Sequence, residues 1–174
     1  MKKLLSILFI SLIFFACNKE DDRRYTRNEV TYQLFQSSDF AYTGMATLRE
    51  LNTGELEMEI TLDGPKDSTP YFFPVHLHFG SYDQADSPIA FLFNPVDIRT
   101  LKSVTKMDVL SDGRVLTFED FKNFDGHIKI HLADSGPEYN IYLTVGNVGG
   151  NDNSRAAFDR NNISLCAPDM GGLD

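Results

Sequence analysis

The sequence predicts an all-β domain, an antiparallel Greek-key β-sandwich or barrel, and three observations support this. Residues 55–62 alternate acidic or polar with apolar side chains without interruption, which is typical of a strand with one face on a core and one in water. Several other short apolar runs are separated by turn residues. No segment is long and periodic enough to supply the helices of a parallel α/β sheet, so we expect at most a short helical turn.

The expected strands can be placed along the chain in order. The turn residues Asn52-Thr53-Gly54 join the strand 55–62 to a preceding run, 42–50, as its antiparallel partner. The remaining expected strands are 30–35, 73–79, 89–93, 106–110, 126–132 and 139–145. The period of two then assigns an inward-facing set of Leu56, Met58, Ile60, Val75, Leu77, Ile128 and Ile130.

Two further local expectations concern polar residues. Thr117 is expected to cap one helical turn over 117–123, because Glu119 and Asp120 in the first turn favour its positive end. The carboxylates of the strand 55–62 are expected to form a solvated face, since they all lie opposite its apolar residues.

The start of the chain has the features of a secretion signal. Met1-Lys2-Lys3 is basic, and the apolar run that follows it is far shorter than the ~20 residues of a membrane-spanning helix. Phe14-Phe15-Ala16-Cys17 resembles a lipobox, in which the cysteine accepts lipid and becomes the new N-terminus. We therefore expect a lipoprotein signal peptide over 1–16, lipidation of Cys17, a lipidated N-terminus with a flexible tether over 17–29, and one domain over 30–174.

Charge and cysteine content restrict the partners and the location. The acidic residues that follow Cys17 resemble export signals, so we expect an outer-membrane lipoprotein that faces the periplasm or the cell surface and contacts the membrane through its N-terminal lipid. The formal net charge of −9 argues against binding to nucleic acid. A protein or glycan partner is left unspecified. With Cys17 lipidated, Cys166 has no disulfide partner within the chain.

The four histidines are the residues where chemistry is expected. His76 and His78 alternate with apolar residues on one strand, and His127 and His131 do so on another. Side chains two apart on a strand start about 7 Å apart, close enough to converge on one metal ion. The alternation sends all four away from the core, where they are either partly exposed sheet-face residues or metal ligands. Lys129 lies on the same face, and its charge would oppose a cation if it pointed inward.

A set of short motifs links these histidines to a known family. The motifs are Pro74-Val75-His76-Leu77-His78-Phe79-Gly80, Asn94-Pro95-Val96-Asp97, Phe124-Asp125-Gly126, Ile130-His131-Leu132 and Gly146-Asn147-Val148-Gly149-Gly150-Asn151. Over residues 30–151 they resemble the CHRD-domain family, in particular its small bacterial lipoproteins. The resemblance implies a sandwich related to copper/zinc superoxide dismutase, in which His76, His78 and His131 match three copper ligands. His127 matches none.

The sequence also departs from the dismutase pattern. The dismutase needs a bridging histidine and further zinc ligands in the loop after the first histidine pair, and this chain has no histidine between His78 and His127. Leu92 stands where a zinc histidine would be. Efficient superoxide dismutase activity is therefore not expected, and the sequence leaves open whether the protein is an enzyme at all.

Two classes of function remain. The first is a membrane-anchored extracytoplasmic lipoprotein that serves as a non-enzymatic binding or structural module. The second is a mononuclear copper or zinc protein that uses His76, His78 and His131. A separate ligand set, for calcium, would draw on oxygen atoms of Asp83, Asp86 and residues 151–153. No Gly-x-Ser-x-Gly motif, Cys-His pairing or P-loop points to a catalytic alternative.

Overall fold

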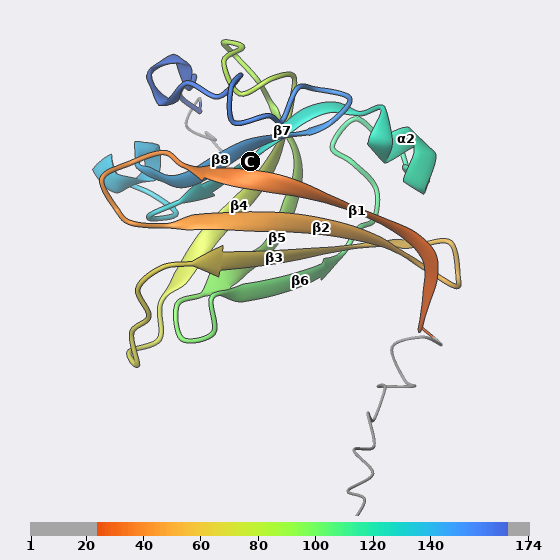
Figure 1. The fold of residues 1–174 in the computed structure, drawn as a ribbon, viewed down its shortest axis with the longest axis horizontal. Coiled ribbons are helices and arrows are strands. Elements are labelled where there is room, and N and C mark those ends of the chain that lie inside the picture. The colour runs from red at the N-terminus through yellow and green to blue at the C-terminus, as the bar shows by residue number, and fades with distance from the viewer. Residues whose placement is uncertain (1–23, 167–174) are drawn as a thin grey trace, which may run out of the picture.

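The computed structural model describes residues 24–166 and shows an all-β protein (Figure 1), as the sequence predicts. The strands are β1 (Tyr25–Gln36), β2 (Thr43–Leu51), β3 (Leu56–Asp63), β4 (Phe72–Phe79), β5 (Ile89–Asp97), β6 (Lys102–Lys106), β7 (Asp125–His131) and β8 (Tyr142–Gly149). The helical pieces are α2 (Phe118–Lys122) and the 3-10 turns η1 (Pro137–Asn140) and η2 (Arg160–Asn162). The expected signal peptide, Cys17 and the first part of the expected tether lie outside the described residues.

The strands form one closed antiparallel barrel in the order β1-β2-β3-β6-β5-β4-β7-β8. The chain crosses over between β3 and β4 and again between β6 and β7, which is the Greek-key connection. Pairing is thin at two seams: β5 and β6 share one pair, Asp97 with Lys102, and β1 and β8 share only two. The barrel is therefore flattened into two four-stranded halves, and Figure 1 shows β1, β2, β3 and β6 passing in front of the other half.

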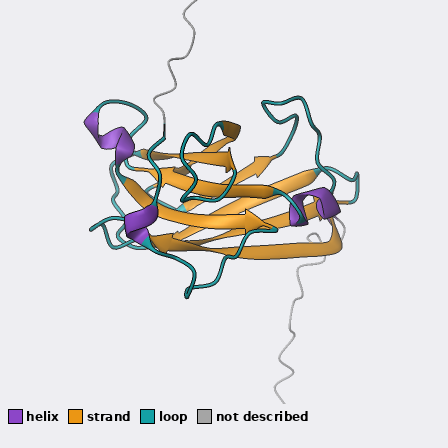
Figure 2. Ribbon diagram, turned by 90° about the horizontal axis from the view of Figure 1, so that it is seen from above, coloured by secondary structure: helices purple, strands orange, loops and turns teal. Residues whose placement is uncertain are grey.

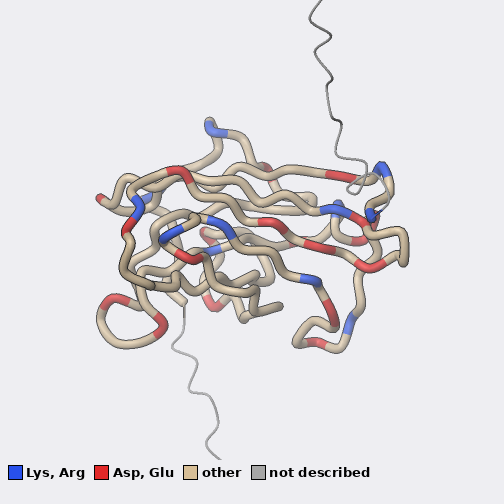
Figure 3. The backbone as a smooth tube through the Cα atoms, turned by 90° about the horizontal axis from the view of Figure 1, so that it is seen from below, with Lys and Arg blue, Asp and Glu red and all other residues tan. Residues whose placement is uncertain are grey.

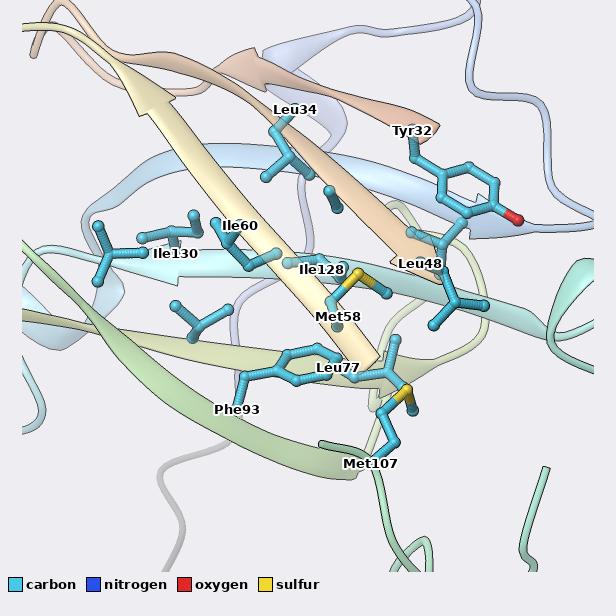
Figure 4. Packing of buried hydrophobic residues seen from close by; sticks show 14 of the residues in the cluster. Tyr32, Leu34, Leu48, Met58, Ile60, Leu77, Phe93, Met107, Ile128 and Ile130 are labelled. Atoms are coloured by element: carbon cyan, nitrogen blue, oxygen red, sulfur yellow. The ribbon is translucent and has the colours of Figure 1, made fainter. Parts of the chain in front are cut away.

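The core fills the space between the two halves. Met58 and Ile60 of β3 meet Leu77 of β4 and the isoleucines of β7 there (Figure 4). All seven residues assigned to the core from the period of two are at most 2% exposed, which confirms the inward face of β3, β4 and β7. Burial of this apolar surface is the main favourable term in folding. The opposite faces of the same strands are thereby fixed as well, since neighbouring side chains alternate.

The one α-helical turn follows its local sequence. The side chain of Thr117 accepts a hydrogen bond from the backbone N–H of Asp120, and the Asp120 carboxylate accepts one from the backbone N–H of Thr117. This reciprocal capping box satisfies two backbone donors at the start of α2. The turn ends at Asn123, and Figure 2 shows the helical pieces lying outside the strand layers. The predicted turn and its cap are confirmed.

The prediction of a strand at 106–110 is wrong. The strand is β6, Lys102–Lys106, and in it the usual polarity is inverted: Ser103 and Thr105 are buried while Val104 is 44% exposed. The two hydroxyls form hydrogen bonds to β5, with which β6 shares only one residue pair. Ser103 Oγ donates to Asn94 O at 2.6 Å, and Thr105 Oγ accepts from Asn94 N at 2.8 Å. Side-chain hydrogen bonds thus replace the backbone ladder between β5 and β6, and apolar alternation does not reveal such a strand.

Three other strands differ from the expectation by more than one residue at a boundary. β5 continues to Asp97, beyond the expected end at residue 93. β1 begins at Tyr25, so residues 25–29, which we expected in the tether, belong to the sheet. β8 begins at Tyr142 rather than at residue 139, because Pro137 starts the 3-10 turn η1 before the strand.

The expected solvated face of carboxylates on β3 is wrong in one position. Glu57 is 5% exposed, because its carboxylate binds the guanidinium of Arg24 and the hydroxyl of Tyr25. Glu59 is half-buried and pairs with Arg49 at 3.0 Å. Figure 3 shows acidic and basic positions interspersed along the strands, which is the arrangement that these pairs require.

Candidate metal centre

The candidate site begins with the pairing of β4 and β7. In this antiparallel pair His76 lies opposite Lys129, and His78 lies opposite His127. The apolar partners of the same strands, such as Leu77 opposite Ile128, face the core. All four histidines therefore leave by the outer face of the barrel, as the period of two predicts.

Three of the histidines form a cluster. One ring nitrogen each from His76, His78 and His131 lies within 4.8 Å of the other two. The ring centroids of His76 and His131 are 4.4 Å apart, and those of His76 and His78 are 5.9 Å apart. The structure thus brings together the three residues singled out from the sequence, close enough to hold one metal ion.

The expectation that these histidines are partly exposed is wrong. His76 is 9% exposed, His78 1% and His131 0%. They are covered by a second, smaller apolar group on the outer face, the outer cluster, which consists of Tyr82, Tyr139, Tyr142, Val145 and Cys166 with Phe158 and Ile163 packed against it. Most of these residues come from the loop after β4 and from the chain after β8. Figure 1 shows the chain after β8 in dark blue, beside β7 and β8.

Backbone carbonyls orient two of the clustered rings. Nδ1 of His78 lies 2.9 Å from Ser87 O, and Nδ1 of His131 lies 2.7 Å from Tyr139 O. A carbonyl oxygen can only accept, so each Nδ1 carries the proton and each neutral ring presents the lone pair of Nε2. Metal-binding histidines usually make such a second hydrogen bond. Here the carbonyl oxygens of Ser87 and Tyr139 orient the two rings.

Burial keeps these imidazoles neutral. It lowers the pKa of His78 and of His131 to about 3 each, and the positive charge of neighbouring histidines and of Lys129 acts in the same direction. A ligand nitrogen must be unprotonated to bind a metal. Near neutral pH no proton therefore competes for the Nε2 atoms of these two rings.

His127 is separate from the three-residue cluster. Its ring stacks on that of His78 with centroids 5.0 Å apart, and its Nδ1 lies 2.7 Å from Gly80 O. Burial lowers its pKa to about 3 as well. Its Nε2 is buried without a hydrogen-bond partner. His127 is thus a buried neutral ring next to the cluster, in accord with its lack of a counterpart in the dismutase pattern.

Lys129 points into the same covered region, as its position predicted. It is 1% exposed, its Nζ donates to Ser164 O at 2.5 Å, and it lies 4.9 Å from the centre of the Tyr142 ring. Burial lowers the pKa of Lys129, whereas the nearby thiol of Cys166 acts to raise it. The ammonium is held by Ser164, in the C-terminal part of the described chain.

Sequence reasoning missed Cys166. Its Sγ lies 3.4 Å from His78 Nε2 and 3.9 Å from His131 Nε2, and the residue is 4% exposed. The sequence predicts that Cys166 has no disulfide partner and indicates no pairing of a cysteine with a histidine, and the second of these expectations is wrong. Its distance of 35 residues from His131 gives no local motif. The one available indication was an unpaired cysteine in a chain with clustered histidines.

The ligand set proposed for calcium finds less support in the structure. Among residues 24–166 the histidine cluster is the one group of three or more His, Cys, Asp or Glu side chains close enough to hold a metal ion. The amide groups expected to contribute to calcium binding have structural roles: Asn151 donates to Asp125, and Asn153 donates to backbone oxygens of Gln33 and Asn147.

Fold and site together define a closed antiparallel barrel with a buried three-histidine group on its outer face. Comparison of the chain with protein-family models, curated proteins and solved structures finds no match. The resemblance to the CHRD-domain family therefore stays a prediction. Of the described helical segments, none has the length and the apolar character to cross a bilayer.

Proposed function

We propose that this protein binds a single copper or zinc ion through His76, His78 and His131, as a non-enzymatic metal-binding module. The observation that carries the proposal is the convergence of three buried imidazoles within 4.8 Å. Imidazole nitrogen suits both copper and zinc, and the affinity order of divalent ions favours copper. Burial in a covered site supports a role in holding an ion, since little room is left for a substrate.

One ion per chain is the expected stoichiometry. The segment between His78 and His127 contains no histidine, so the residues for a second, bridged ion are absent from the sequence. Two-metal redox catalysis of the dismutase type is not part of this proposal.

We further propose that the domain works outside the cytoplasm as a lipoprotein, with Cys17 lipidated after removal of residues 1–16. The support is the basic start, the short apolar run and the lipobox-like Phe14-Phe15-Ala16-Cys17. Only residues 18–24 then separate the lipidated cysteine from the start of β1 at Tyr25. The domain would sit close to the outer membrane, on its periplasmic or its external side.

Titration calorimetry with zinc and with copper tests the metal proposal. We would use the full chain carrying Cys17→Ser, so that the N-terminal thiol binds no metal. This protein should bind one ion, and the double variant His76→Ala/His131→Ala should lose that binding, because one remaining imidazole cannot hold the ion tightly. His127→Gln is the matched control, because it changes a buried histidine outside the cluster and should leave the stoichiometry at one.

Equal and weak binding by the parent and the double variant would contradict the metal proposal. The histidines would then be structural residues beneath the outer cluster. A binding or structural module without metal would be the remaining function.

A further inference from the structure

Cys166 lies next to two of the three histidines of the cluster. Its Sγ contacts the Nε2 atoms of His78 and His131, at 3.4 and 3.9 Å. These are the nitrogens left free by the hydrogen bonds of both rings to backbone carbonyls. Because each Nε2 is an acceptor, the thiol can donate its one proton to either of them, and a metal ion would bind the same nitrogens.

Several hydrogen bonds to different elements hold this cysteine in position. The backbone N–H of Cys166 donates to the hydroxyl of Tyr142 on β8 at 2.8 Å. Two residues earlier, the N–H of Ser164 donates to Tyr82 O at 2.9 Å, and Ser164 O accepts from Lys129 Nζ on β7. The thiol is therefore placed by the fold and is more than an incidental neighbour of the histidines.

The distances suit ligands of one ion. With metal–nitrogen bonds of about 2.0 Å and a metal–sulfur bond of about 2.3 Å, a tetrahedral site places sulfur about 3.6 Å from each nitrogen. The observed separations of 3.4 and 3.9 Å lie on either side of that value. Small side-chain movements would bring both contacts to the bonded geometry.

The charges near the cluster also favour Cys166 as a ligand. A cation held by three neutral imidazoles beside the buried Lys129 would leave several positive charges out of water. Glu57 is the only carboxylate that is buried among residues 24–166, and it is bound to Arg24. Cys166 is the group next to the histidines that can supply a negative charge, since metal binding displaces the thiol proton.

We propose that Cys166 is the fourth metal ligand, so that the site holds its ion through three imidazoles and one thiolate. This inference rests on the proposed function and deepens it. On binding, the S–H proton passes to solvent and a sulfur–metal bond forms, with no change of oxidation state. A thiolate in the ligand set selects zinc or copper(I) over harder cations. The site is thereby assigned to those two ions.

Cobalt(II) is a suitable probe, because it replaces zinc and its bond to sulfur absorbs light in the near-ultraviolet. The full chain with Cys17→Ser, in which Cys166 is the one remaining thiol, should show this sulfur-to-cobalt charge-transfer band on titration. The variant Cys17→Ser/Cys166→Ser should lose the band and bind zinc at least about tenfold more weakly, in line with the effect of losing a metal-site partner.

The outcomes separate this inference from the proposed function. Binding of one ion by both proteins, with no sulfur band in either, overturns the role of Cys166 and leaves the three-histidine site standing. No binding by either protein overturns both. X-ray absorption of the zinc-loaded Cys17→Ser chain needs no change at Cys166: a sulfur neighbour at about 2.3 Å supports the inference, and a shell of nitrogen and oxygen alone contradicts it.

Discussion

At the scale of single residues, the histidines owe their properties to what covers them. An imidazole on a water-facing strand would titrate near its ordinary pKa of about 6.5. Here carbonyl oxygens of Ser87, Tyr139 and Gly80 each bind one ring, and burial lowers the pKa of all three rings to about 3. The carbonyl contacts fix the tautomer of each ring and act to raise its pKa, but burial outweighs them, so each ring is difficult to protonate.

This predicts that the protein loses stability on mild acidification. The folded-state pKa values of His78, His127 and His131 lie below their unfolded values, so the unfolded chain binds more protons between about pH 6.5 and 3. Their contribution is fully present above pH 6.5 and is lost as the pH falls. Three such groups amount to about 4 kcal/mol per pH unit, at roughly 1.4 kcal/mol each. Urea unfolding of the metal-free chain between pH 7 and 5 measures this slope.

A control variant isolates the contribution of one ring. His127→Gln removes one of the three titrating groups and should reduce the slope by about a third, since each ring contributes one proton. A stability that stays constant from pH 7 to pH 5 would show that the rings are more accessible to solvent than the structure indicates.

At the scale of elements, the alternation of side chains predicts the strands whose inner face is uniformly apolar. β3, β4 and β7 lie where the pattern places them, and β4 and β7 are neighbours in the barrel. β6 was missed because its buried residues are Ser103 and Thr105, which serve hydrogen bonding rather than core packing. A period of two is visible in sequence only when burial and apolarity coincide.

The hydroxyls of β6 should therefore matter for stability. Thr105→Val keeps the shape of the side chain but removes the acceptor of Asn94 N–H, so we expect a loss of about 1–2 kcal/mol in the free energy of unfolding. Val104→Thr, at the exposed position between the two hydroxyls, should change it by no more than about 0.5 kcal/mol. Both substitutions are measured by denaturant unfolding. Equal effects on the free energy of unfolding would contradict the idea that the side-chain hydrogen bonds stabilise the contact between β5 and β6.

At the scale of the whole molecule, the sequence predicts the closed β architecture and the three histidines but not the enclosure of the site. The period of two correctly sends the rings to the outer face. Part of their cover comes from the chain after β8, which lies far from His76 and His78 in sequence and has no strand pattern. Long-range packing of irregular segments has no periodic signature, and for the same reason the contact of Cys166 with His78 was not foreseen.

The proposed anchoring of the whole domain at a membrane can be tested at Cys17. Changing Cys17 to Ser should abolish labelling of the protein with radioactive fatty acid and leave the precursor uncleaved by the lipoprotein signal peptidase, because lipid is attached to that sulfur. The Cys166→Ser variant is the control and should be labelled and cleaved normally. Continued labelling of the Cys17→Ser protein would contradict anchorage through the lipobox.

The covering of the histidines by the last described residues also has a kinetic consequence. The barrel is closed by its eight strands alone, whereas Ser164 and Cys166 rest on it through a few hydrogen bonds to Tyr82, Tyr142 and Lys129. Such a segment can open locally at a lower free energy than the barrel unfolds. The exchange rate of a bound ion would then follow the lifting of this segment, so the protein could retain its cargo for long periods and still release it without losing its fold.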